Sequence, residues 1–303
     1  RISFREIEQR PLLRAGDVLE TVPGLVATQH SGSGKANQFY LRGFNLDHGT
    51  DFATNLDGMP INMRSHAHGQ GYTDLNFIIP EMIKEIVYRK GSYYSDVGDF
   101  SGAGSASIYT HSETIPNRIQ LGAGGFGFAR ALVTGNTEGL GGNLIFGFEH
   151  QAYEGPWDSV DEDVGKTNIQ LKQSWERESG KFILSLMAYE NKWNSADQIP
   201  HRAVRSGLIG KFGSIDPTSG GESSRYSLSF ALDSDLGAGN LSASMYVIDY
   251  DLTLFQNFSY FSNPTGDQTT QLDERRIFGG KAVWSSERNW AGKSVVNRFG
   301  VDC

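Results

Sequence analysis

From about Asn117 onward, apolar side chains alternate with small or polar ones along the chain. The stretch 226–232, for example, reads Tyr-Ser-Leu-Ser-Phe-Ala-Leu. A period of two is typical of a β-strand that has one apolar face. The pattern predicts about nine such strands, at 118–125, 128–136, 142–150, 166–176, 181–191, 223–233, 239–251, 274–286 and 294–301.

The connections between these strands alternate in length. Short connections lie at 178–180 and 236–238, whereas long ones lie at 192–222 and 252–273. Short turns on one side and long loops on the other are typical of an outer-membrane β-barrel. A soluble β-sandwich also alternates, but the loop rhythm and the strand length favour the barrel. Aromatic residues at strand ends are expected to form its interfacial girdles: Trp175, Tyr189, Trp193, Tyr250 and Trp284.

The first third of the chain lacks this regular alternation and predicts a mixture of short helices and strands. Asp17 and Glu20 have the spacing of a capping box, which predicts a short helix that ends at Pro23-Gly24. Short strands are expected at 25–28, 38–43 and 52–56, with a hairpin turn at Asp57-Gly58. Pro80 opens one helical turn before a strand at 83–88. This part is predicted to be a small α+β unit.

Composition narrows the class of protein. The formal charge is −8 with only 27 Lys plus Arg, so a nucleic-acid partner is not expected. The single cysteine, Cys303, forms no internal disulfide. The longest uninterrupted apolar runs, 186–189 and 245–248, are far shorter than the roughly 20 residues of a membrane-spanning helix. Barrel strands need no such run, because only alternate residues face lipid.

Five motifs in the first third carry a family resemblance. They are GDVLETVPGL at 16–25, YLRGF at 40–44, LDGMPI at 56–61, IKEIVYRKG at 83–91 and GDFSGAGSASI at 98–108. In this order and spacing they closely resemble the plug domain of TonB-dependent outer-membrane receptors. The chain departs from the family at 89–92, where Arg-Lys-Gly-Ser stands in place of a frequent Arg-Gly-Pro.

The resemblance implies an all-β membrane fold, with an α+β plug domain over residues 1–112 and antiparallel barrel strands over 113–303. About nine strands cannot close a plugged barrel of roughly 22 strands. We therefore expect the chain to be cut at both ends, with the signal peptide and the TonB-binding box before residue 1.

The resemblance also implies a function in the bacterial outer membrane. The expected activity is TonB-dependent uptake of a scarce ligand, such as a ferric siderophore or another metal chelate. The implied partners are TonB with the ExbB/ExbD inner-membrane complex, outer-membrane lipid and the small-molecule ligand. No resident cofactor and no enzymatic activity are expected; metal enters only as cargo.

The segment His66-Ala67-His68-Gly69-Gln70-Gly71-Tyr72 is the most unusual local feature. The resemblance places it in an apical plug loop that faces the external cavity. We therefore predict substrate contacts from His66, His68, Gln70 and Tyr72. In an extended chain His66 and His68 point the same way, so a metal contact by these two imidazoles is a further hypothesis.

A second apical loop is expected at 30–38, which reads His-Ser-Gly-Ser-Gly-Lys-Ala-Asn-Gln. Its amide and cation donors, Lys35, Asn37 and Gln38, suit an oxygen-rich substrate, although a plain solvent loop has the same composition. Charge contacts between plug and barrel are expected from Arg42, Arg89 and Lys90. The segment 47–51, Asp-His-Gly-Thr-Asp, is either a cation site or a turn.

Two other classes of protein remain open from the residues alone. One is a soluble, secreted β-rich binding protein that uses the HAHGQGY loop for a metal or a sugar. The other is a metal-dependent hydrolase that uses His66 and His68. No serine-nucleophile elbow, HExxH motif or cysteine nucleophile supports catalysis.

Overall fold

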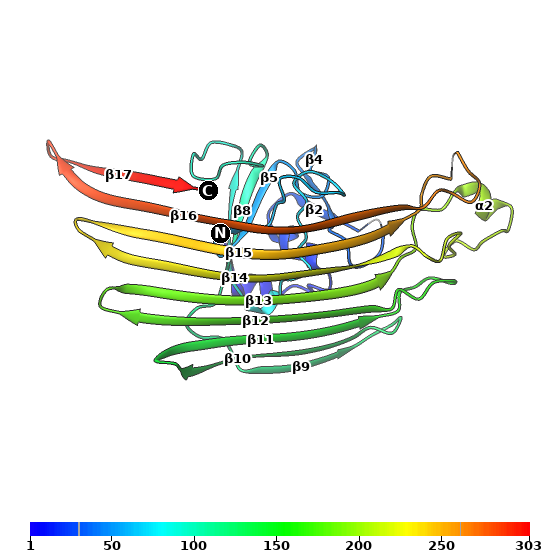
Figure 1. Cartoon of the computed structure of the whole chain (residues 1–303), viewed down its shortest axis with the longest axis horizontal. Coiled ribbons are helices and arrows are strands. Elements are labelled where there is room, and N and C mark those ends of the chain that lie inside the picture. Colours follow the sequence, from blue (N-terminus) through cyan, green and yellow to red (C-terminus); the bar gives the residue numbers. More distant parts are fainter. Residues whose placement is uncertain (30, 261) are drawn as a thin grey trace.

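A large antiparallel sheet dominates the computed structural model, which describes residues 1–29, 31–260 and 262–303. Its nine strands pair only with their neighbours in sequence. Figure 1 shows this sheet as a curved wall, with two smaller sheets packed against its middle. The short turns lie at one end of the wall and the long loops, which include the helix α2 (His201–Arg205), lie at the other.

All nine predicted strands are present, and most are longer than predicted. They are β9 (Arg118–Ala123), β10 (Ala129–Gly139), β11 (Gly142–Tyr153), β12 (Val164–Arg177), β13 (Gly180–Asn194), β14 (Gly220–Leu236), β15 (Gly239–Gln256), β16 (Thr269–Trp290) and β17 (Lys293–Asp302). The additional length lies mostly at the ends that carry the long loops. Polar residues there stay extended because the neighbouring strand continues to pair with them, for example Lys192 with Glu222.

The two faces of this wall differ as the alternation predicts. On β13, Leu184 and Leu186 are exposed on the outer face, whereas Ser185 and Met187 are buried on the inner face. Leu186 pairs with Leu228 of β14, which is also exposed, so the apolar side chains of adjacent strands form a continuous outer band. An apolar outer face and a mixed inner face are the arrangement of a membrane barrel wall.

The prediction of aromatic girdles was wrong for three of its five residues. Tyr189, Trp193 and Tyr250 are on the inner face and are almost completely buried. They occupy the same alternate positions as the other inward residues. Tyr189 packs in the core of the N-terminal part, and Trp193 and Tyr250 pack with the loop residues Ala36 and Tyr72. Trp175 and Trp284 are only partly buried and donate to the carbonyls of Leu140 and Leu236 beside the short turns.

The small sheets are formed by residues before Pro116. One has the strand order β1-β7-β8-β5-β6, in which only β5 and β8 are parallel, and the other has the order β2-β3-β4. The strands are β1 (Ile2–Ser3), β2 (Leu25–Thr28), β3 (Gln38–Leu41), β4 (Phe44–Asn45), β5 (Phe52–Leu56), β6 (Met59–Pro60), β7 (Ile83–Lys90) and β8 (Gly104–Thr110). Three short helices complete this α+β part: α1 (Phe4–Glu8), η1 (Ala15–Thr21) and η2 (Pro80–Met82).

Two local predictions need correction. The helix predicted before Pro23-Gly24 is η1, a 3-10 helix that begins at Ala15, so Asp17 is its third residue and accepts from the backbone N–H of Arg14 at 3.0 Å. Glu20 instead accepts from the N–H of Ala27. The expected strand 38–43 is also interrupted, because Arg42 and Gly43 both have positive φ and form the turn between β3 and β4.

The turn at Asp57-Gly58 is confirmed. Both residues have positive φ, 49° and 88°, as a two-residue hairpin turn requires. Asp57 also accepts hydrogen bonds from the backbone and hydroxyl of Thr110, at 3.0 and 2.6 Å. This turn therefore holds the ends of β5 and β8 together.

The N-terminal part and the wall share their apolar cores. Met187 and Tyr189 of β13 belong to the main core cluster, whose other buried members all precede residue 109. Tyr72 and Met63 pack in a second cluster with Trp193, Ile248 and Tyr250. Among the described residues, no helix is long and apolar enough to cross a membrane.

Candidate functional site

The loop 63–72 rises from the N-terminal part toward the end of the wall that carries the long loops. An isolated bridge between Met63 and Tyr72 closes it. Asn62 stabilises its base, because its amide nitrogen donates to the carbonyl of Gly49 at 2.8 Å and to the hydroxyl of Thr73 at 2.9 Å. Hydrogen bonds thus fix the base of this loop. We call residues 63–72 the apical loop.

His66 lies flat against Tyr72 within this loop. The two ring centroids are 3.9 Å apart and the rings are inclined by only 5°. His66 Nε2 is 3.3 Å from the hydroxyl of Tyr250 on β15 and its side chain is completely buried. Burial lowers the pKa of His66 to about 4, although the neighbouring carboxylate of Asp273 opposes this shift. His66 is therefore a neutral imidazole at physiological pH.

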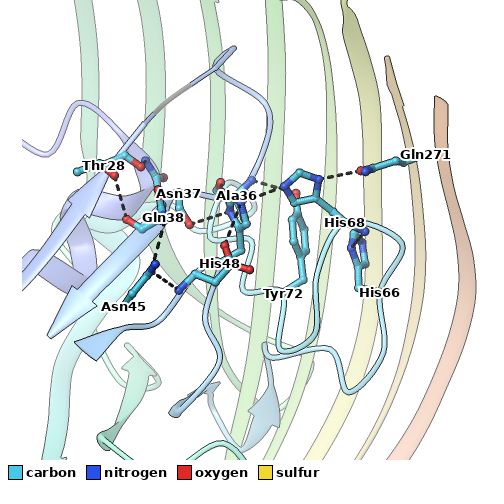
Figure 2. A network of polar contacts seen from close by, with 11 residues as sticks. Thr28, Ala36, Asn37, Gln38, Asn45, His48, His66, His68, Tyr72 and Gln271 are labelled. Carbon is cyan, nitrogen blue, oxygen red and sulfur yellow. Dashed lines mark hydrogen bonds and ion pairs between the residues drawn. The ribbon is translucent and has the colours of Figure 1, made fainter. Parts of the chain in front are cut away.

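His68 bridges the N-terminal part and the wall (Figure 2). Its Nε2 is 2.9 Å from Nε2 of His48, and its Nδ1 is 2.7 Å from Oε1 of Gln271 on β16. His48 is buried, and its Nδ1 faces the carbonyl oxygen of Ala36 at 3.0 Å. Burial lowers the pKa of His68, and the charge of Lys35 lowers it further.

Strand β16 holds the apical loop with alternate residues of its inner face. Besides Gln271, Asp273 accepts from the backbone N–H of Ala67 at 2.9 Å, and Arg275 donates to the carbonyl of Ser65. Arg275 and Asp273 also form an ion pair at 2.5 Å. Residues 65–68 are thus attached to the wall at three successive inward positions.

The second predicted loop packs against the long loop that follows β13. Gly32 N–H donates to the hydroxyl of Ser195 at 2.9 Å, and a Cβ on Gly34 would overlap the ring of Trp193 at 1.9 Å. Lys35 is buried, which lowers its pKa to about 8, while Asp197 opposes the shift. Asn37 and Gln38 contact Thr28 and Asn45. His30, at the start of the predicted loop, lies outside the described residues.

The predicted substrate residues therefore differ in their accessibility. Gln70 of the apical loop is exposed, and Gln38 is partly exposed. Tyr72, Lys35 and Asn37 are buried, and the hydroxyl of Tyr72 accepts from the N–H of Ala36 at 2.9 Å. These buried residues brace the two loops against each other, and their contact with a substrate stays a prediction.

The imidazoles of His66 and His68, which the sequence suggests as metal ligands, do not point at a common site. The rings of His66 and His68 have separate partners, and the backbone N–H of His68 donates to Nδ1 of His66 at 3.1 Å. Across residues 1–29, 31–260 and 262–303, no group of three or more His, Cys, Asp or Glu side chains is arranged to hold a metal ion. The segment 47–51 forms a turn, in which Asp47 and Asp51 have positive φ. A metal contact by His66 and His68 stays a prediction.

The charge contacts between the N-terminal part and the wall involve residues that the sequence did not single out. Arg89 pairs with Asp96, within the N-terminal part, at 2.7 Å. Arg42 and Lys90 are exposed and have no salt bridge in the described part of the chain. The pairs that do cross the interface include Glu81–Arg130 at 2.7 Å and Asp57–Lys172 at 2.7 Å.

Comparisons with known proteins show which proteins share this arrangement. Residues 1–105 match the family model described as TonB-dependent Receptor Plug Domain. The chain as a whole has the fold of the plug and part of the barrel of TonB-dependent receptors. From here on, the N-terminal part is called the plug, and the wall formed by β9–β17 is called the barrel wall.

Three solved structures illustrate the likeness. They are the siderophore receptor PirA from Acinetobacter baumannii (16% identity, TM-score 0.69, 99% of this chain and 47% of that chain), the ferric citrate transporter FecA in its unliganded form (14%, 0.75, 96% and 45%) and the receptor FpvA from Pseudomonas aeruginosa bound to pyoverdine (12%, 0.72, 99% and 45%). The chain thus spans less than half the length of each.

Proposed function

We propose that the protein acts in the bacterial outer membrane as a receptor that imports a scarce ligand with energy supplied through TonB. The cargo we propose is a ferric siderophore or another metal chelate. The observation that carries the proposal is a plug seated on the inner face of a wall whose outer face is apolar. A plug blocks passive diffusion, so import through it requires work from outside the barrel.

The outer face also argues against the soluble binding protein. Large apolar side chains are exposed there on strand after strand, for example Leu228, Met245, Phe278 and Phe299, which are 45–70% exposed. A soluble protein rarely exposes so extended an apolar surface, because each side chain costs free energy in water. Lipid removes that cost.

The choice of cargo is supported by the proteins that share the fold. PirA is a siderophore receptor, FecA transports ferric citrate, FpvA binds pyoverdine and OprC is a copper transporter. All four handle metals or metal chelates. The apical loop adds neutral imidazole, amide and hydroxyl groups, which suit hydrogen bonding to an organic chelate.

Uptake by intact cells tests the proposal. The complete receptor would be produced in cells that lack their own receptors, with TonB present or deleted. Accumulation of ⁵⁵Fe from ferric citrate, ferric pyoverdine and a ferric catecholate would be measured, with copper(II) ion as a separate probe. We expect TonB-dependent accumulation of at least one iron chelate. Accumulation of none, or equal accumulation without TonB, would contradict the proposal.

The same assay tests the loop residues. Gln70→Ala removes an exposed amide of the apical loop. Gln268→Ala is the control; it removes an exposed amide in the long loop before β16, where Gln268 donates to Thr218 and Asp216. If the apical loop contacts the cargo, Gln70→Ala weakens uptake about 5-fold or more, the cost of about one lost hydrogen bond. Equal effects of the two variants would remove Gln70 from the site.

A further inference from the structure

His48, His68 and Gln271 form a hydrogen-bonded chain that runs from the plug to the barrel wall (Figure 2). Each ring nitrogen of the two histidines has a partner. His48 Nδ1 faces the carbonyl oxygens of Ala36 and Asn37 at 3.0 and 3.2 Å, and the other contacts are 2.9 and 2.7 Å long. We call these three side chains the relay.

The partners of His48 determine which nitrogens carry hydrogen. Carbonyl oxygens only accept, so Nδ1 of His48 must donate to them. A neutral His48 then has a lone pair on Nε2, which must accept from Nε2–H of His68. His68 is left with a lone pair on Nδ1, so a donor must face it. Gln271 supplies that donor when its terminal amide turns by 180°, which places nitrogen where oxygen otherwise lies.

The relay is neutral in this arrangement. An additional proton on either ring would also satisfy the chain, with Oε1 of Gln271 accepting from His68. That charge would lie between two buried rings. Burial lowers the pKa of His68, which favours the neutral form, although the contact with Gln271 and the charge of Asp47, whose carboxylate lies 3.7 Å from Nε2 of His48, oppose this shift. All donors therefore point from the barrel wall toward the plug.

We propose that His48 is a positioning residue, which fixes the tautomer of His68 and thereby latches the apical loop to Gln271 of β16. The two other attachments of the loop to β16 use the charged side chains of Asp273 and Arg275. Hydrogen bonds to charged groups are stronger than those between neutral groups. The His68–Gln271 contact is thus the weakest of the three, and it opens first.

The tautomer also sets the chemistry that opens the latch. Because Nδ1 of His68 presents a lone pair, only a hydrogen-bond donor or a cation can replace Gln271 there. A carboxylate or a bare carbonyl cannot. If the protein imports a chelate, as proposed above, a hydroxyl or amide N–H of that chelate is the group that displaces Gln271. This last step depends on the transport proposal, whereas the latch does not.

Hydrogen exchange in the complete receptor, without any ligand, tests the latch. The reporters are the amides of Ala67, which donates to Asp273, and His68, which donates to His66. Gln271→Leu removes the wall partner. We expect exchange at both amides to rise about three- to tenfold. The amide of Thr54, which donates to Asn62 at the base of the loop, serves as an internal control and is expected not to change.

Two variants of His48 separate positioning from simple packing. An asparagine amide reaches the place of Nδ1 and keeps the bond to Ala36, whereas a glutamine amide reaches the place of Nε2 and keeps a partner for His68. We expect His48→Asn to raise exchange at Ala67 and His68 as Gln271→Leu does, and His48→Gln to stay within about twofold of the wild type.

Two results would overturn the latch. One is a Gln271→Leu variant whose Ala67 and His68 amides exchange at the wild-type rate. The other is a set of variants in which Thr54 exchanges faster by the same factor as the apical loop, since this would indicate general loosening of the plug. If a His48 variant fails to fold, the comparison of Gln271→Leu with the wild type still decides the question. None of these outcomes depends on transport.

Discussion

Arg130 of β10 and Glu81 of the plug form a forked ion pair. Nη1 and Nη2 of Arg130 lie 2.7 and 2.8 Å from the two carboxylate oxygens of Glu81. Nε of the same guanidinium is 2.6 Å from Glu149 of β11, whose second oxygen accepts from Asn168. One barrel arginine therefore joins a plug carboxylate to a carboxylate of the wall, in the bidentate geometry that favours arginine over lysine.

Loss of Arg130 and loss of Glu81 are expected to destabilise the plug by different amounts of free energy. Arg130→Met leaves Glu81 without its cation and leaves Glu149 with Lys166 alone, at 3.3 Å, and is expected to cost about 3–5 kcal/mol, as for a broken buried pair. Glu81→Gln leaves Arg130 still paired with Glu149, so it is expected to cost about 1–3 kcal/mol. Exchange of the Met82 amide, which bonds Ile79, measures both. Equal effects of the two variants would contradict this ranking.

Lys172 is expected to anchor the hairpin turn of the plug. Its ammonium group is buried and lies 2.7 Å from Asp57. Lys172→Met is expected to raise exchange of the Thr110 amide, which donates to Asp57, by about tenfold, because a partly buried carboxylate loses its cation. Lys192→Met, at an exposed position on β13, is the matched control. A Lys172 variant that behaves like the control would remove this anchor.

Asp74 gives the plug a defined pH dependence. Burial raises its pKa from 3.8 to about 6, although hydrogen bonds from Asn76 and the charges of Arg225 and Lys166 oppose the shift. The folded state therefore holds this proton more tightly than the unfolded state. Its contribution to stability is complete below about pH 4 and is lost as the pH rises to about 6.

Asp74→Asn removes this pH dependence. The variant is expected to gain stability relative to the wild type between about pH 4 and 6, by up to about 3 kcal/mol at neutral pH. Thermal unfolding of both proteins in detergent, from about pH 4 to 8, measures the difference. A difference that is constant across this range would show that Asp74 does not titrate as described.

The outer face of β13 provides a test of the membrane assignment. Leu186→Arg places a charge in the apolar band and is expected to cost about 2–4 kcal/mol of folding free energy in lipid. Glu190→Arg lies on the same face of the same strand, beyond the band, and is expected to cost about 1 kcal/mol or less. Folding yield of the complete receptor into lipid vesicles compares them. Equal yields would place Leu186 outside the hydrocarbon layer.

The barrel strands were predictable because alternation is a local signal. Every predicted segment lies on a strand, since the lipid face requires apolar side chains at every second position. The inner face was less predictable. Tyr189 and Tyr250 look like interfacial aromatics in sequence, and only contact with the plug explains their burial. The turn at Arg42 was missed because a non-glycine residue with positive φ is uncommon there.

The site was predictable only in part, for a similar reason. The HAHGQGY segment stands out as a motif, and it does form the apical loop. His48, which contacts that loop through His68, has no sequence signal that connects it to the loop. Gln271, Asp273 and Arg275 are about 200 residues away in the chain, as the contact of Ala67 with Asp273 illustrates. Their spacing at every second residue of one strand indicates that the three side chains share a face, but it does not indicate which segment they contact.

A reversible cross-link between plug and barrel wall tests the central claim most directly. A Cβ on Gly32 would lie 2.9 Å from Cβ of Ser195 and 2.8 Å from Cδ1 of Trp193. The pair Gly32→Cys and Ser195→Cys can therefore form a disulfide once the two segments move apart by about 1 Å, which also relieves the contact with Trp193. Cys303 would be replaced by serine, and each single cysteine variant is a control. The readout is TonB-dependent uptake of the transported chelate.

If import requires the plug to move within the barrel, the oxidised double variant loses most of its uptake and regains it after reduction. The single variants keep wild-type uptake under both conditions. Full uptake by a receptor that is completely cross-linked would contradict the account, because the cargo would then pass a plug whose apical segment cannot leave the wall.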